Sequence, residues 1–399
     1  MNRDATDQAI EDVKPAKGSV GEVAMVFLKL GTIAFGGPAA HIAMMHEEIS
    51  RRRGWVSEER FVDLLGAANL IPGPSSTELA IYLGYERSGW RGLVLGGVCF
   101  IVPAMFLVFV IAWAYVDYGA TPQANWLLYG IKPVIVAIIL QALWGLFGTA
   151  VKGPLLAGAV VFVLGLYLAG FSPVALIFGS GLLVALIQNG WRFFRKQKIT
   201  GASVVLLSSI GASGAVAGMV QVPFSLPTLF VTFLKLGSVV FGSGYVLLAF
   251  LRNDFVHRLG WLTDQQILDA VAVGQFTPGP VFTTATFIGY VVGGVPGAIL
   301  ATVGIFLPSF VFVAAVFPLV GMLRRSSWAG GFLDGVNVAA LGLMAGVTWQ
   351  LGRAAVVDWV TAVVVLASAV LVFRFKINSA WLVLGGGVVG LFSKLLLAP

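Results

Sequence analysis

The sequence is poor in charged residues. Asp, Glu, Lys and Arg make up 11% of its 399 residues while 58% are hydrophobic, and a soluble domain usually has about 25% charged residues. This composition excludes a water-soluble fold. The sequence also has one cysteine, Cys99, which excludes an internal disulfide and a thiolate metal site.

Histidine is almost as scarce. His41, His46 and His257 have no acidic residues at ligand spacing, so they do not make a metal site. The sequence has no P-loop, Rossmann fingerprint or nucleophile elbow. We therefore expect no cofactor, no enzymatic activity and no ATP-driven pumping by this chain alone. The polar first 18 residues show no signal-peptide pattern.

Long apolar stretches fill most of the sequence. Segments close to the roughly 20 residues of a membrane helix occur about six times in 20–190, about six times in 227–397, and once more weakly at 201–222. The expected fold is an all-α polytopic membrane protein with about 13 membrane segments. The expected parts are a cytoplasmic N-terminal tail (1–19), a first transporter repeat (20–190), a basic loop with a linking membrane segment (191–225) and a second transporter repeat (226–399).

The two halves of the sequence repeat each other. KLGTIAFGGP (29–38) matches KLGSVVFGSG (235–244), and NLIPGPSSTE (69–78) matches QFTPGPVFTT (275–284). Duplicated halves are common in transporters. Because an odd number of crossings separates equivalent positions, we expect two inverted-topology repeats.

Each repeat contains two segments interrupted by glycine and proline. These are FGGP (35–38) and IPGP (71–74) in the first half, and FGSG (241–244) and TPGP (277–280) in the second. Pro-Gly-Pro breaks a helix, and broken backbone is tolerated in a bilayer only where protein buries it or where it lines a cavity. The four breaks predict a central site near the midplane. Breaks that merely kink helices are the alternative.

The basic residues bear on topology. The formal net charge is +7, and a cytoplasmic N-terminus places most bases in cytoplasmic loops, so nucleic acid is not an expected partner. The run Arg51 to Arg53 is an exception under strict alternation of spans. It returns to the cytoplasm if the first two segments of each half are re-entrant hairpins, although Arg252 and Arg258 then move outside. Spanning and re-entrant segments both stay open.

The residues after each Pro-Gly-Pro break resemble helix starts. Early proline and nearby hydroxyls favour a helix N-terminus, whose N–H groups and dipole bind anions. A tetrahedral oxyanion could be held there by both halves. The predicted substrate-binding residues are Lys29, Gly36, Gly37, Pro72, Gly73, Pro74, Ser75, Ser76, Thr77, Lys235, Gly242, Ser243, Gly244, Pro278, Gly279, Pro280, Thr283 and Thr284.

Ionisable residues near the breaks suggest further roles. Lys29 and Lys235 are repeat-matched within apolar segments, so we interpret them as attractors for a dianion, with snorkelling to an interface as the alternative. Glu78, matched by Thr284, would repel an anion unless protonated. It is a candidate proton carrier, and compensation of a helix dipole explains it equally well.

Three other ionisable residues are expected at the membrane interface. Asp63 and Asp269 are repeat-matched on amphipathic stretches that precede the Pro-Gly-Pro breaks. Lys132 adjoins a proline near the start of its segment. Long basic side chains near helix ends usually reach the interface, so none of the three is predicted to belong to the site.

The paired motifs, FGGP with IPGPSST and FGSG with TPGPVFTT, resemble the chromate ion transporter family of the long, two-domain type. The resemblance covers residues from about 20 to the C-terminus. It implies a multi-pass secondary transporter of the bacterial inner membrane that exports chromate and confers resistance, with inverted halves. It also implies sulfate as the competitor, since both are tetrahedral dianions.

Other functions stay open beside chromate export. A transporter of sulfate or another oxyanion would use the same site, because near-isosteres differ in binding by only about 1–3 kcal/mol. An anion channel of the same architecture would conduct without alternating gates. The expected partners are chromate, sulfate and membrane lipid, and the oligomeric state is open between a monomer and a homodimer.

Overall fold

A computed structural model describes most of the chain, in residues 18–35, 37–119, 121–196, 222–241, 244, 246–319 and 326–397. Gly36, Gly242 and Ser243 of the predicted site, and nearly all of the expected linking segment at 201–222, lie outside the described residues. The described part is built of helices without a strand. This confirms an all-α fold.

The helices follow the sequence repeat. The first repeat has α2 (Val20–Ile33), α3 (Gly37–Met45), the π-helical η1 (His46–Arg52), α4 (Glu58–Ala68), α5 (Ser75–Tyr118), α6 (Pro122–Ala150), α7 (Pro154–Leu168) and α8 (Pro173–Lys196). The second has α9 (Leu226–Val239), α10 (Leu247–Leu251), the π-helical η2 (Arg252–Arg258), α11 (Asp264–Phe276), η3 (Val281–Thr283), α12 (Thr284–Val316), η4 (Phe317–Leu319), α14 (Ser327–Ala355), α15 (Trp359–Arg374) and α16 (Ser379–Leu397).

Five helices of the described part are long and apolar enough to cross a membrane, namely α5, α6, the part of α8 at Pro173–Gly190, α12 and α14. Shorter apolar helices accompany them, so the chain is a multi-pass membrane protein. The segment count of about 13 stays a prediction. The apolar stretch at 64–85 is divided between α4 and α5.

The helices α2, α3, η1, α4 and the first part of α5 form two hairpins. Arg53, after η1, donates to Glu22 at the start of α2 with an N–O distance of 3.3 Å, and Arg60 of α4 pairs with Glu86 of α5. The chain therefore leaves each hairpin at the end where it began. The 14-residue α2 is about 21 Å long at 1.5 Å per residue, shorter than a hydrocarbon core of about 30 Å.

The second repeat has the same hairpins. The indole of Trp261, after η2, donates to the carbonyl of Val222, before α9, at 2.7 Å. The Trp261 ring also contacts Phe224 and Phe255. We call α2–α5 and α9–α12 together the hairpin body. The term scaffold denotes α6–α8 and α14–α16.

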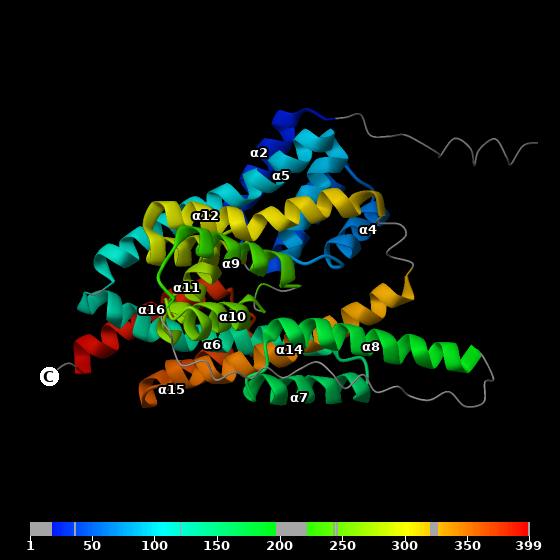
Figure 1. Cartoon of the computed structure of the whole chain (residues 1–399). Helices are drawn as coiled ribbons and strands as arrows, with labels where there is room; N and C mark the ends of the chain where they lie inside the picture. The colour runs from blue at the N-terminus through cyan, green and yellow to red at the C-terminus, as the bar shows by residue number, and fades with distance from the viewer. Residues whose placement is uncertain are drawn as a thin grey trace, which may run out of the picture.

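The long helices α5 and α12 lie side by side and run antiparallel (Figure 1). Tyr85 near the start of α5 contacts Phe317 just beyond α12, and Tyr115 near the end of α5 contacts Phe287 near the start of α12. Both helices kink at matched positions, Ser88–Gly89 in α5 and Gly293–Gly294 in α12. Equivalent helices of the two repeats thus point in opposite directions.

The scaffold interleaves the repeats. The helix α6 packs on α15 and α16, and its counterpart α14 packs on α7 and α8 (Figure 1). Glycines make the crossings close. A Cβ on Gly130 would lie 1.9 Å from the carbonyl oxygen of Gly386, and one on Gly335 would lie 2.3 Å from that of Ser180. Small residues permit such contact between membrane helices.

Candidate functional site

The hairpin tips of the two repeats bond to each other. The amide of Gly73 donates to the carbonyl of Val240 at 2.7 Å, and the amide of Gly279 donates to the carbonyl of Ala34 at 2.9 Å. Ala34 and Val240 end the first helix of their hairpins at equivalent positions. The breaks predicted separately in the two halves therefore meet at one place.

The Pro-Gly-Pro backbone is buried at both tips. Gly73 has φ +138° and Gly279 has φ +86°, a region that disfavours any side chain. A Cβ on Gly73 would lie 2.1 Å from Oε1 of Glu78, and one on Gly279 would lie 2.7 Å from Cβ of Ala104. Neighbouring Pro74, Pro278 and Pro280 are also buried, and Pro72 is half-buried. The broken backbone is enclosed in protein, as a bilayer requires.

The first tip leads into α5, whose opening turn carries buried hydroxyls. Ser75, Ser76 and Thr77 are all buried. The Ser76 hydroxyl lies 3.3 Å from Nδ1 of His41, which is also buried. The Thr77 hydroxyl has no hydrogen-bond partner among the described residues. This turn offers polar atoms and a helix N-terminus at the tip contact.

The second tip is chemically different. The hydroxyls of Thr283 and Thr284 are buried and donate to the carbonyls of Pro280 and Val281, at 2.8 Å and 2.7 Å. Their hydrogens are thus used within the turn. Gly244 approaches this turn, since a Cβ there would lie 3.2 Å from Cβ of Val281. The two tips therefore differ in the hydroxyl groups that they could offer a ligand.

Glu78 is fully buried one turn into α5. Its carboxyl group and the Ser309 hydroxyl of α12 both lie against Gly73. Neither Glu78 oxygen has a hydrogen-bond partner within the described part of the chain. The equivalent positions in the other repeat hold Thr284 and Ala104. A carboxyl group therefore adjoins the tip contact on one side of the site.

The two predicted lysines are ion-paired. Lys235 lies 2.5 Å from Asp254, which also accepts from Arg258 at 2.8 Å. Lys29 lies 3.5 Å from Glu48. Glu48 and Asp254 occupy equivalent positions in η1 and η2, so extending the repeat through these acids could have identified them from the sequence.

Each lysine cluster keeps an excess of positive charge. Arg52 lies 3.8 Å from Glu48. The equivalent Arg258 lies closer to Asp254, at 2.8 Å. Lys235 and Arg258 thus share one carboxylate in the second repeat, whereas in the first repeat Arg52 also pairs with Glu47, at 3.2 Å. The Lys29 and Lys235 side chains are 53% and 37% exposed, so their charge reaches beyond the pair. Whether they contact substrate stays a prediction. Gly37, at the start of α3, has open space where a Cβ would lie.

The expectation that Asp269 and Lys132 lie at an interface is wrong. Asp269 is 2% exposed, its carboxylate lies 3.2 Å from Nζ of Lys132, and it accepts from the Tyr115 hydroxyl at 2.9 Å. The Lys132 side chain is 16% exposed. The cause is tertiary packing, since α11 of one repeat packs on α6 of the other. The sequence of either helix alone does not predict this contact.

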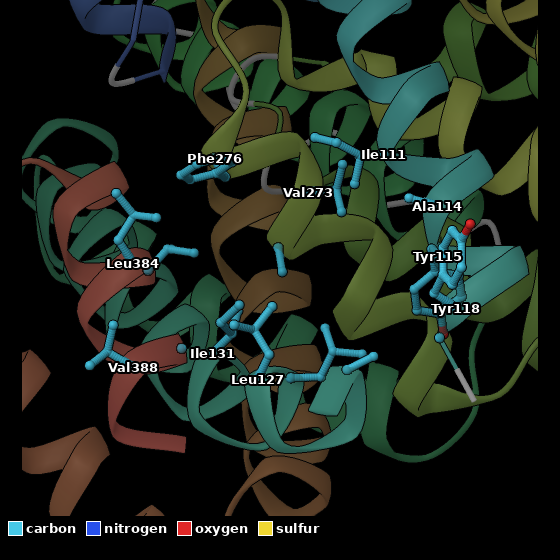
Figure 2. Close-up of a pocket in the computed structure, with 16 residues that line it drawn as sticks. Ile111, Ala114, Tyr115, Tyr118, Leu127, Ile131, Val273, Phe276, Leu384 and Val388 are labelled. Atoms are coloured by element: carbon cyan, nitrogen blue, oxygen red, sulfur yellow. The ribbon is translucent and has the colours of Figure 1, made fainter. Parts of the chain in front are cut away.

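A cavity of about 410 Å³ lies beside this ion pair, between α5, α6, α11 and α16 (Figure 2). Its lining residues are almost all apolar, with Tyr115 and Tyr118 at one end. No charged residue lines it. An oxyanion needs donors or positive charge, so this cavity does not suit one.

Comparison with known proteins gives a consistent result. The chromate transporter family model matches twice, at residues 21–185 and 227–391. A chromate transport protein of Cupriavidus metallidurans is 34% identical, over 94% of this chain and 94% of its own length. A probable chromate transport protein of Synechococcus elongatus is 34% identical over 88% and 89%. One from Pseudomonas aeruginosa is 32% identical over 97% and 95%.

No solved structure shows a significant match to the chain. The fold is therefore known from the helices described above, and the family is known from sequence similarity. The family model covers both halves with the same pattern. Together with relatives above 30% identity along nearly the whole chain, this match shows that the protein belongs to the chromate transporter family.

Proposed function

We propose that this chain is a secondary active transporter that exports chromate across the bacterial inner membrane and so confers chromate resistance. Three relatives that match most of its length are named for chromate transport, one of them as probable. The observation that carries the proposal is the reciprocal contact of Gly73 with Val240 and of Gly279 with Ala34. It brings the two buried Pro-Gly-Pro breaks onto the ends of α2 and α9 at one place, which supports a site like those of transporters with midplane binding sites.

The proposed chromate site lies at these tips. Backbone amides at the start of α5 and of η3, with the hydroxyls of Ser75, Ser76 and Thr77, would hold the oxyanion oxygens. The described glycines and prolines of the two Pro-Gly-Pro breaks, Pro72 to Pro74 and Pro278 to Pro280, would shape the tips. Sulfate has the same geometry and charge, so it is the expected competitor.

The antiparallel course of α5 and α12 supports inverted repeats with the boundaries expected from the sequence. Hairpins that begin and end on one side support re-entrant segments. With the N-terminus in the cytoplasm, Arg51 to Arg53 then lie on the cytoplasmic side, in agreement with the positive-inside rule. The basic residues at the equivalent end of the second-repeat hairpin would lie on the opposite side of the membrane.

Two sets of charges would serve transport. The positive excess around Lys29 and Lys235 would attract a dianion toward the tips. Glu78, buried beside the proposed site, would carry a proton, since an ionised carboxylate there would repel chromate. The membrane potential, negative inside, favours exit of an anion by about 2.3 kcal/mol per charge per 100 mV, which is consistent with export.

Chromate flux into inverted and right-side-out vesicles tests the proposal. We expect gradient-dependent flux that sulfate inhibits and that Lys29→Ala with Lys235→Ala reduces at least about tenfold, since a dianion loses two attractive charges. Lys152→Ala is the matched control, because that exposed lysine pairs with Asp334 in the scaffold. Absence of flux from well-folded protein would reject chromate transport. Currents far above carrier turnover would favour the channel instead.

A further inference from the structure

The hairpins of the two repeats dock differently. In the second repeat, α11 packs against α6, α14 and α16 of the scaffold, and α10 packs against α14. Its counterpart α4 packs against α5 and η1 within the hairpin body. In Figure 1, α10 and α11 lie between the upper and lower helices, and α4 lies at the edge of the upper group.

Burial follows the same asymmetry at equivalent positions. Val62 of α4 is 53% exposed, whereas Leu268 of α11 is fully buried. Asn69, at the end of α4, is exposed, whereas Gln275 of α11 is 6% exposed. The same face of the same hairpin is thus covered by the scaffold in one repeat and uncovered in the other.

Polar contacts hold the second-repeat hairpin to the scaffold. Asp269 pairs with Lys132 of α6 at 3.2 Å. Arg252 donates to Gln350 of α14 at 2.5 Å, and Gln265 donates to the carbonyl of Ala354 at 2.7 Å. We call these three contacts the latch. Asp269 is the buried member, so its pairing matters most, because an unpaired charge in such a place is strongly destabilising.

We propose that the chain has a second state in which the repeats exchange roles, so that α4 docks on the scaffold as α11 does here and the latch opens. Inverted repeats that differ in conformation support this step, since each repeat can adopt the arrangement of the other. The inference rests on the proposed secondary active transport and names the helices and contacts that would move. The position that Lys132 holds here is taken in the exchanged state by Asn337, which would meet Asp63.

The exchange is unequal in energy. The described state forms a buried Lys–Asp ion pair, whereas the exchanged state would pair Asp63 with the neutral Asn337. The latch therefore favours the described state, and removing both of its charges shifts the population toward the exchanged state. Removing both charges also avoids leaving one of them unpaired and buried.

Two cysteine pairs in a Cys99→Ala background report the two states. Gln265→Cys with Ala354→Cys joins residues in contact here. Asp63→Cys with Asn337→Cys joins residues that meet only after exchange. A short, cleavable bis-methanethiosulfonate reagent is applied in proteoliposomes without chromate, and intramolecular crosslinks are quantified by mass spectrometry. Single-cysteine variants give the background.

Both yields are then measured with Lys132→Met and Asp269→Asn present. We expect the Asp63–Asn337 crosslink to form and its yield to rise at least about threefold, while the Gln265–Ala354 yield falls. Gln350→Ala, which removes the neutral partner of Arg252 in the latch, shifts both yields in the same directions by less. This second variant keeps the test valid if the double variant folds poorly.

Three results would overturn the inference. These are no Asp63–Asn337 crosslink in any background, a crosslink only between two chains, or yields of both pairs that stay constant or move together when the latch is removed. Because chromate is absent from the assay, these outcomes are independent of substrate. Failure of chromate flux with successful exchange would reject the substrate and leave the two states intact.

Discussion

The amide of Gly73 in the first repeat is bonded to the carbonyl of Val240 in the second, and the sequence repeat reproduces this bond at Gly279 and Ala34. Each tip thus donates a hydrogen bond to a backbone carbonyl at the end of the first helix of the other half. In a bilayer an unsatisfied backbone group costs several kcal/mol, so the contact contributes to stability as well as to the site.

Alanine at Gly73 or Gly279 is expected to destabilise the protein and abolish flux. A positive φ costs a non-glycine residue about 1–3 kcal/mol, and the new Cβ would also overlap Glu78 or Ala104. Thermal unfolding in detergent and chromate flux measure the two effects. Gly148→Ala in α6, where a Cβ meets open space, should match wild type. Unchanged unfolding in both tip variants would contradict the tip geometry.

Glu78→Gln is expected to keep chromate exchange between the two sides but remove the dependence of net flux on a pH gradient. Glutamine has the same shape and cannot release a proton, so binding persists while proton movement stops. Flux in proteoliposomes with and without an imposed gradient measures this. Glu59→Gln, on the exposed face of α4, is the control. If the gradient still drives Glu78→Gln normally, Glu78 is not the proton carrier.

Lys235 and Asp254 are expected to be energetically coupled by about 1–3 kcal/mol in a double-mutant cycle of Lys235→Ala and Asp254→Asn. Asp254 is buried, so losing one base leaves its carboxylate less compensated. The Lys29–Glu48 pair is longer, and both side chains are more exposed, so its cycle should give a smaller value. Equal values would show that burial does not set the coupling.

Gly130→Ala and Gly335→Ala are expected to lower stability by similar amounts, about 1–3 kcal/mol each. Either Cβ would overlap a carbonyl oxygen of the facing helix, which forces α6 from α16 or α14 from α8. Unfolding in detergent measures the loss. Gly145→Ala, in open space on α6, provides the control, and wild-type unfolding in both crossing variants would refute matched close packing.

Much of the architecture is accessible from the sequence because glycine and proline determine backbone directly. The repeat and the positions of the breaks follow from them, and the helical class follows from the apolar stretches. The helix α11 ends where TPGP begins, and two residues separate the end of α4 from IPGP. Apolar length does not separate spanning from re-entrant segments, since it is similar in both. The contacts of Trp261 and Arg53 at the open ends of the hairpins support the re-entrant arrangement that we propose.

The charged contacts were harder to predict. Lys29 and Lys235 stand out in the sequence as charges within apolar segments, but their partners lie on another helix of the same hairpin, so periodicity along one helix does not identify them. The pairing of Lys132 with Asp269 joins different repeats and depends on how α11 packs against α6. Propensity and spacing describe single segments and carry little information on such contacts.

The reciprocal tip contact also bears on how a long chain of this kind can arise. A half-length chain with only the first tip would find its missing acceptor in a second copy inserted in the opposite orientation, and both copies would then carry identical side chains. Fusion of the two copies removes that constraint. It allows one half to keep Glu78 and Lys132 while the other has Thr284 and Asn337, so a symmetric ancestor becomes a transporter with distinct sides.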